Sequence, residues 1–249
     1  MEQLFKNGKG FIPACDVSEL EKLEDVAFAT LQVPGIKALK IGLELVIPFG
    51  LIEAVRSVER VRHTYKLGLD VPIIYDHQKG GTDIPELGAK FAKAVKRSGA
   101  DAIILFPFGG AKTEREWIKA CEGEGLKVLV GGHMTQAEFL ESEGGFIGDL
   151  SPERMFRIAL ELGVSDFILP GNKVPFVEKY RKIFQEYWSD GSYSISAPGF
   201  IKQGGIISEA GAVAGPVWNA IIGDKIYNAG RLTDMTAAAK MFTSQILAT

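Results

Sequence analysis

The chain has 249 residues, of which 46% are hydrophobic and 24% are charged, and its formal net charge is −3 at pH 7. This is the composition of a folded globular protein, and a slightly acidic chain without a basic block is not expected to bind nucleic acid. No apolar run approaches the roughly 18 residues of a transmembrane helix, and residues 1–9 lack the apolar core of a secretory signal.

Eight apolar runs with strand character alternate with segments of helical periodicity along the whole chain. Ser151 is a predicted N-cap with a proline behind it, and Thr233 is a predicted N-cap of the last helix. Eight strand–helix units over this length predict that residues 1–249 form a single (β/α)8 barrel of the α/β class, with a doubly wound open sheet as the alternative. The predicted strands are residues 10–15, 36–41, 71–75, 102–106, 127–131, 166–169, 193–197 and 218–222.

Ionisable residues stand where the first three predicted strands end, which is the active-site face of such a barrel. They are Asp16, Lys40, Asp76 and Lys79, with Asp83 following. An alternating array of this kind keeps its lysines protonated and its carboxylates ionised. It can oppose a negative group, stabilise a carbanion and donate a proton, so it predicts a decarboxylation in which Asp76 faces the departing carboxylate and Lys79 protonates the carbon. A structural salt-bridge cluster is the alternative.

The loops after the last two predicted strands indicate a phosphate site. Residues 196–205 form a glycine-flanked loop that contains Lys202 and Gln203, and residues 219–227 contain Gly223 and Lys225. Loops at these positions of a barrel commonly bind phosphate through backbone N–H groups and a helix N-terminus. We expect Gln203 and a lysine to assist, Lys225 in preference to Lys202, although an ordinary turn would also account for the glycines.

The three histidines and two cysteines indicate no metal or cofactor. His133, at the end of the fifth strand, could approach a ligand, and His77 is expected to support the site by hydrogen bonding. No combination of histidine and carboxylate has the spacing of a metal site. Cys15 and Cys121 are predicted to be buried free thiols, which indicates a reducing, cytoplasmic location.

Taken together, these segments resemble the orotidine 5′-monophosphate decarboxylases, a barrel family that converts orotidylate to uridylate without a cofactor. The resemblance spans nearly the whole chain. The motifs that carry it are Asp16, the Lys-Ile-Gly of residues 40–42, the run from Asp76 to Pro85, residues 99–104, residues 133–135, and Pro198-Gly199 with Gln203-Gly204-Gly205.

The resemblance implies specific site residues and a homodimer that binds a nucleotide. The composition predicts no membrane or nucleic-acid partner. Asp83 would reach into the site of the neighbouring subunit. The implied catalytic residues are Lys40, Asp76, Lys79 and Asp83, and the implied substrate-binding residues are Asp16, Ile84, Thr135, Pro198, Gln203, Gly204, Gly223 and Lys225.

Three features depart from the family pattern, and one of them is Leu87, which stands where the family has a Thr. The interval from Asp76 to Lys79, and that from Lys79 to Asp83, are each one residue longer than in the family. Because alternate strand residues face opposite sides, a bulge is needed to keep Lys79 on the correct face. The glycines at residues 80–81 would permit such a bulge. Asp224 stands where the family has a phosphate-binding Arg, so we expect its side chain to turn to solvent and a lysine to compensate.

Two other functions fit parts of the pattern. A Mg²⁺-dependent sugar-phosphate lyase of the same superfamily, such as hexulose-phosphate synthase, would use carboxylates to hold the metal. In those relatives a Glu tends to stand at the position of Lys40, so this lysine favours the decarboxylase. A barrel that binds a nucleotide without turnover is the second alternative, supported by Asp224 and the lengthened spacing.

Overall fold

Eight parallel strands close into a barrel in the order β1 to β8, and β8 pairs back with β1. The structure is a computed structural model, and it describes residues 3–249 except for the side chains of Gln78 and Lys79. The predicted (β/α)8 barrel, a TIM barrel, is confirmed, and the open-sheet alternative is wrong. The strands are β1 (Gly10–Cys15), β2 (Leu39–Ile41), β3 (Ile73–Gly80), β4 (Ala102–Leu105), β5 (Lys127–Gly131), β6 (Asp166–Ile168), β7 (Ser194–Ala197) and β8 (Trp218–Ile222).

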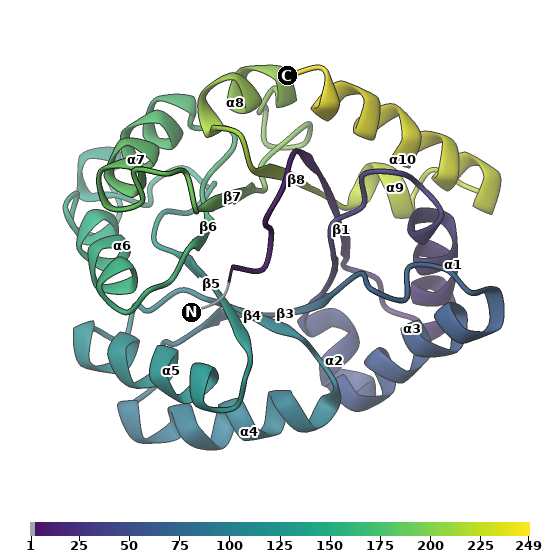
Figure 1. Ribbon diagram of the computed structural model, residues 1–249, viewed down its shortest axis with the longest axis horizontal. Coiled ribbons are helices and arrows are strands. Elements are labelled where there is room, and N and C mark those ends of the chain that lie inside the picture. The colour runs from purple at the N-terminus through teal and green to yellow at the C-terminus, as the bar shows by residue number, and fades with distance from the viewer. Residues whose placement is uncertain (1–2) are drawn as a thin grey trace.

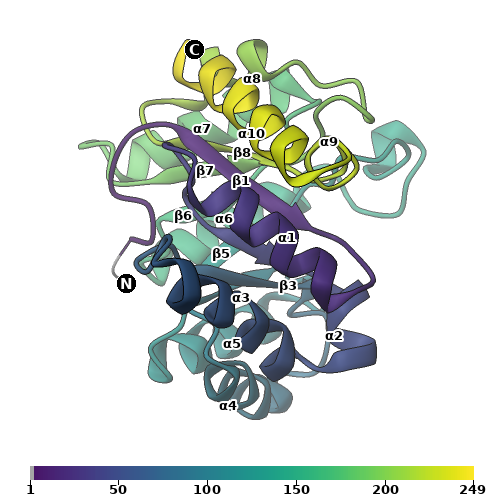
Figure 2. The same cartoon turned by 90° about the vertical axis from the view of Figure 1, so that its right-hand side faces the viewer.

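The helices form a ring around the strands (Figure 1). In Figure 2 the last helix lies beside the first, and contacts between the two complete the ring. Within the described residues, no helix is long and apolar enough to span a membrane. The helices are α1 (Leu20–Leu31), α2 (Leu43–Phe49), α3 (Leu51–Tyr65), η1 (Pro85–Leu87), α4 (Gly88–Ser98), α5 (Ala111–Gly123), η2 (Glu141–Glu143), α6 (Ser151–Glu161), α7 (Val174–Tyr187), α8 (Ile207–Ala214), α9 (Asp224–Tyr227) and α10 (Leu232–Leu247).

The two predicted N-caps lie slightly inside their helices. Helix α6 begins at Ser151 itself, after Leu150. Helix α10 begins at Leu232 rather than after Thr233. A carboxylate explains the second difference, because Asp234 Oδ2 accepts a hydrogen bond from the backbone N–H of Arg231 (3.1 Å) and satisfies the helix start from within the first turn.

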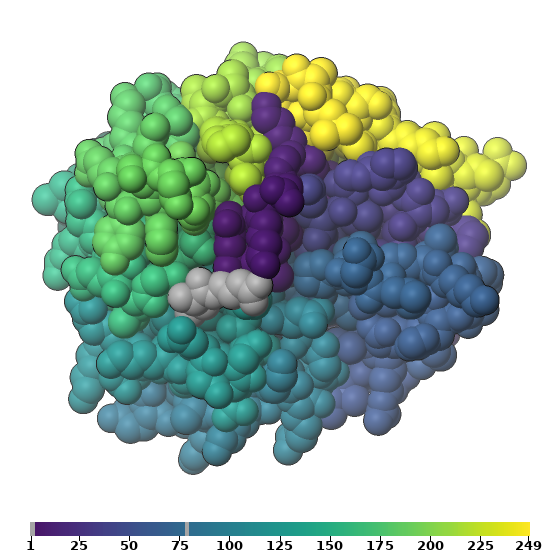
Figure 3. All heavy atoms as spheres, in the orientation of Figure 1, coloured from purple at the N-terminus to yellow at the C-terminus, as the bar shows by residue number. Residues whose placement is uncertain are grey.

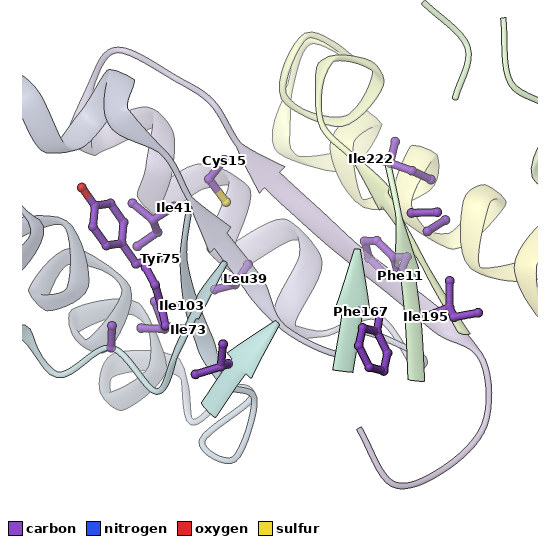
Figure 4. Packing of buried hydrophobic residues seen from close by; sticks show 14 of the residues in the cluster. Phe11, Cys15, Leu39, Ile41, Ile73, Tyr75, Ile103, Phe167, Ile195 and Ile222 are labelled. Carbon is purple, nitrogen blue, oxygen red and sulfur yellow. The ribbon is translucent and has the colours of Figure 1, made fainter. Parts of the chain in front are cut away.

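Alternate strand residues separate two apolar layers. Side chains such as Ile12 and Ile74 fill the barrel interior, whereas Phe11 and Tyr75 belong to the larger cluster between the strands and the helices (Figure 4). Successive side chains of a strand point to opposite faces. The interior set of each strand therefore continues, two residues at a time, toward the C-terminal end of the barrel.

The opposite end of the barrel is closed by the N-terminal segment. The backbone N–H groups of Leu4 and Phe5 donate to the carboxylate of Asp166, at 2.8 and 3.3 Å, and Ser194 Oγ donates to it at 2.6 Å. Asp166 and Ser194 are the first residues of their strands. The segment crosses the barrel opening in Figure 1 and covers the centre of that face in Figure 3. A ligand is thus expected at the other end, where the strands terminate.

Strand β3 contains the predicted bulge. Asp76 pairs with Ile104 of β4, and the next paired residue of β3 is Gly80, which lies opposite Leu105. Residues 77–79 therefore have no partner on β4, so the irregularity is longer than one residue and precedes the glycines. This bulge accommodates the lengthened interval between Asp76 and Asp83 without shifting the register of the strand before it.

Candidate active site

A cavity of about 500 Å³ opens at the C-terminal ends of the strands. Its walls come from the ends of β1 to β3, the loops after β5 and β7, and the start of α9. Eight of the sequence-predicted site residues line it, which are Asp16, Lys40, Asp76, Thr135, Pro198, Gln203, Gly223 and Lys225. Asp83, Ile84 and Gly204 do not line it, and the side chain of Lys79 lies outside the described residues.

Lys40 is held between two carboxylates on the cavity floor. Its Nζ lies 2.9 Å from Asp16 Oδ1 and 3.1 Å from Asp76 Oδ2. Lys40 is buried, and Asp76 is nearly so, whereas the Asp16 side chain is 40% exposed. Burial alone would lower the pKa of Lys40, but the charges of Asp76 and Asp16 outweigh it and raise that pKa above its ordinary value. The ammonium is therefore a permanent cation.

The convergence of these three residues follows from strand phase. Asp16 lies two residues beyond Ala14, Lys40 two beyond Ala38, and Asp76 two beyond Ile74. Those three apolar residues belong to the interior cluster, so the charged residues continue the interior set at the barrel mouth. Gly42 permits the close approach of Asp16, because a Cβ at that position would lie 2.8 Å from Asp16 Oδ1.

His77 belongs to the helix side of β3 rather than to the cavity. Its Nδ1 shares a hydrogen bond with the hydroxyl of Tyr75, and its ring meets that of Phe91 in α4 edge-on at 5.3 Å. Because strand residues alternate, His77 faces away from the side chain of Asp76. Among the described side chains, His77 therefore hydrogen-bonds Tyr75 and not Asp16, Lys40 or Asp76 of the charged array, which differs from the expectation.

His133 lines the cavity, but both of its ring nitrogens have protein partners. Nε2 lies 3.0 Å from Lys173 Nζ, and Nδ1 lies 3.0 Å from the hydroxyl of Tyr180. An ammonium can only donate, so Nε2 accepts, and the proton of the neutral ring is on Nδ1. Burial, followed by the charge of Lys173, lowers the pKa of His133 to about 4. His133 thus anchors the loop that carries Thr135 instead of offering a proton.

Several residues behind the cavity wall, which hold its lining residues in place, escaped the sequence analysis. Lys173 also pairs with Glu143 at 2.8 Å, which ties the start of α7 to η2. Asn172 Nδ2 donates to the backbone oxygens of Thr135 (2.9 Å) and Gln203 (3.3 Å), so it joins the loops after β5 and β7. These contacts join segments about 30 residues or more apart, and no local sequence signal could reveal them.

Asp224 lines the predicted phosphate end of the cavity and does not turn fully to solvent as expected. Its side chain is 24% exposed, with Oδ1 2.8 Å from Lys202 Nζ and 2.7 Å from Asn228 Nδ2. These hydrogen bonds, from Lys202 first and then Asn228, lower the pKa of Asp224. The compensating lysine for Asp224 is therefore Lys202, and Lys225 is an exposed residue of the same wall.

Among the side chains that the structure describes, no three His, Cys, Asp or Glu residues are grouped in a way that could hold a metal ion. On the cavity floor, the ammonium of Lys40 occupies the position between the two carboxylates and would repel a cation there.

The closed barrel and the Asp–Lys–Asp array at its C-terminal end define the class of this protein, a TIM barrel with a charged pocket of enzymatic type. The chain is 28% identical over 221 residues to the curated orotidine 5′-phosphate decarboxylase of Methanosarcina mazei. The aligned residues cover 88% of this chain and 87% of that relative. No protein-family model matches the chain. The resemblance expected from the motifs is confirmed at the level of sequence similarity.

Solved structures agree with this relationship. The orotidine 5′-phosphate decarboxylase of Pyrococcus horikoshii OT3 superposes with a TM-score of 0.71 at 25% identity, covering 95% of this chain and 98% of that one. The orotidine 5′-monophosphate decarboxylase of Methanocaldococcus jannaschii, complexed with the inhibitor BMP, gives a TM-score of 0.72 at 20% identity, covering 96% and 99%. The second likeness shows the fold alone, and it extends over nearly the full length of both chains.

Proposed function

We propose that this chain decarboxylates orotidine 5′-monophosphate to uridine 5′-monophosphate. The observation that carries the proposal is the buried Lys40 ammonium between Asp16 and Asp76 on the floor of the cavity. This array occurs in a chain similar to an orotidine 5′-phosphate decarboxylase over most of its length.

The proposed reaction uses fixed charges and one proton transfer. The substrate carboxylate lies against the Asp76 carboxylate, and this repulsion is relieved when the carbon–carbon bond breaks and CO₂ departs. The electron pair of the bond remains on the ring carbon, where the nearby ammonium groups stabilise it. Lys79 then donates a proton from its ammonium to that carbon and regains one from solvent. Lys40 holds Asp16 and Asp76 in place throughout.

We propose that Thr135, Pro198, Gln203, Gly223 and Lys225 bind the substrate, with the phosphate near the loops after β7 and β8. These residues line one cavity, and backbone N–H groups at a loop and helix start suit a dianion. Gly204 follows Gln203 in the same loop, and its positive φ of 81° gives the turn a conformation that favours glycine.

We infer a homodimer in which Asp83 and Ile84 serve the site of the neighbouring subunit. Both residues are exposed and lie outside the cavity of their own protomer, and Ile84 is 57% exposed although it is apolar. The exposed Ile84 would pack at the contact between the two subunits, and the carboxylate of Asp83 would enter the open, charged pocket of the second copy. A cytoplasmic location is supported by the two free, buried cysteines, Cys15 and Cys121.

An orotidylate assay with and without a chelator tests the proposal. Orotidylate absorbance should fall and uridylate should accumulate at the same rate in both samples, while Lys40→Ala protein, matched for folding by circular dichroism, should show no turnover. Uridylate binding without turnover would identify a non-catalytic barrel instead. Activity lost to the chelator and restored by Mg²⁺ would favour a sugar-phosphate lyase.

A further inference from the structure

Helix α5 holds the loop that carries Asp83. Thr113 Oγ1 donates to the backbone oxygen of Asp83 (3.0 Å), and Trp117 Nε1 donates to the backbone oxygen of Ile84 (3.0 Å). Thr113 and Trp117 are 3% and 4% exposed. They are four residues apart in α5, so their side chains lie on one face of the helix and reach two consecutive carbonyls of the loop.

The backbone of this loop packs closely against the start of α5. A Cβ at Gly109, just before the helix, would lie 3.0 Å from the backbone oxygen of Asp83. A Cβ at Gly88 would lie 2.8 Å from Trp117 Cδ1, so α4 also approaches the indole without an intervening side chain. The indole ring further packs against Phe91, with ring centroids 4.9 Å apart.

The peptide group between Asp83 and Ile84 is held from both sides. Its oxygen accepts from Thr113, and its N–H donates to Asp83 Oδ1 at 2.7 Å. Fixing this peptide plane and the next carbonyl restricts the backbone dihedrals from which the Asp83 side chain projects. Pairing with β4 resumes at Gly80 after the bulge at residues 77–79, and the hydrogen bonds from α5 then hold the loop that follows.

We propose that Thr113 and Trp117 are positioning residues for Asp83, and that they set the direction in which its carboxylate leaves the surface of the protomer. The inference rests on the proposed function, in which Asp83 takes part in catalysis. Neither side chain lines the cavity, so neither contacts a substrate there. Their effect on the reaction would pass entirely through the loop.

The test removes each donor, keeping the shape of the side chain at Thr113 and an aromatic ring at Trp117. Thr113→Val and Trp117→Phe each lose one hydrogen bond, and Thr113→Ser keeps the donor as the matched control. Losing a hydrogen bond of this kind and loosening a reacting group should reduce kcat about tenfold with little change in KM, whereas Thr113→Ser should stay close to wild type. In an Asp83→Asn background, Thr113→Val should cause no further loss, because both changes act through one carboxylate.

A second measurement does not depend on turnover. Hydrogen–deuterium exchange of residues 80–87 should rise in Thr113→Val and Trp117→Phe proteins and stay unchanged in Thr113→Ser protein. Wild-type kcat together with unchanged exchange in the two donor-free variants would overturn the inference. It would also be overturned if Thr113→Val reduced kcat as much in the Asp83→Asn background as in the wild-type protein. A wild-type protein with no decarboxylase activity would overturn the proposed function instead, and the exchange result would still decide whether α5 fixes the loop.

Discussion

Lys202 Nζ lies 2.8 Å from Asp224 Oδ1, so an ion pair joins the loop after β7 to helix α9 at the rim of the cavity. The acidic residue that replaces the expected arginine is therefore neutralised by a lysine from the neighbouring loop. A ligand phosphate at this rim would approach a balanced pair rather than an isolated carboxylate. Lys225, on the same wall, is then the cation that we expect to bind the phosphate.

Lys225→Ala should weaken uridylate binding by at least about tenfold, because a hydrogen bond from a charged donor to phosphate is lost. Binding of the phosphate-free nucleoside should barely change. Isothermal titration calorimetry with both ligands measures the difference. The matched control is the double variant Lys202→Ala/Asp224→Ala, which removes the ion pair as a unit and should leave uridylate affinity within about threefold of wild type. Equal losses for nucleotide and nucleoside would contradict this assignment.

Lys40→Ala should reduce decarboxylation by more than about 10³-fold, because it removes the cation that organises two carboxylates. It should also destabilise the fold by about 2–3 kcal/mol, since Asp76 is left nearly buried without this partner while Asp16 is partly hydrated. Chemical denaturation and the orotidylate assay measure the two effects. Lys37→Ala is the control and should retain activity, because Lys37 is a partly buried lysine outside the cavity that donates to the backbone oxygen of Asn7. Turnover that survives Lys40→Ala would contradict the array mechanism.

Lys79→Ala and Asp83→Ala should each reduce turnover by at least about 10³-fold, and mixing the two impaired proteins should restore part of it. In a mixed dimer one of the two sites regains Lys79 from one subunit and Asp83 from the other. Random exchange of subunits makes half of the dimers mixed, so about one quarter of wild-type activity is expected. Native mass spectrometry verifies the mixed dimers. Mixed dimers without activity, or a monomer at assay concentration, would contradict the shared site.

The contribution of Glu114 to stability should fall as pH rises from about 4.5 to about 8. His133, whose pKa is lowered from 6.5 to about 4, contributes in the opposite direction, so the effect of Glu114 is measured against a variant of Glu114 itself. Burial raises the pKa of Glu114 from an ordinary 4.5 to about 8, and its buried Oε1 has no hydrogen-bond partner among the described residues. The folded protein keeps this proton over a range where the unfolded chain loses it, so the unfolded state gains stability as pH rises.

Glu114→Gln removes this penalty. It should leave the free energy of unfolding nearly unchanged at about pH 5 and increase it by about 2–4 kcal/mol at about pH 8.5. Urea denaturation at the two pH values checks the difference, with the exposed Glu209→Gln as a control for the loss of one surface charge. The opposite sign, a variant less stable than wild type only at high pH, would contradict the assignment of a buried neutral acid.

Local patterns predicted the barrel and much of its charged floor. Strands β1, β5 and β8 occupy the predicted residues, because a polar or glycine residue directly follows each of them. The strand periodicity also identified the positions of Asp16, Lys40 and Asp76 at the strand ends. Strand β2 is shorter than predicted, because Ile36 makes only an isolated bridge to Phe11 and continuous pairing begins at Leu39. Strand β3 continues past Tyr75 through the bulge to Gly80.

The partners of the site residues depended on tertiary structure. Lys202 and Asp224 meet because β7 and β8 are neighbours, and Thr113 reaches Asp83 because α5 packs beside the loop after β3. The sequence by itself determined which side chains share a strand face, because that depends on the two-residue period of the backbone. Closure and register of the barrel decided which faces and loops meet, because these depend on hydrogen bonds between segments that are distant in the chain.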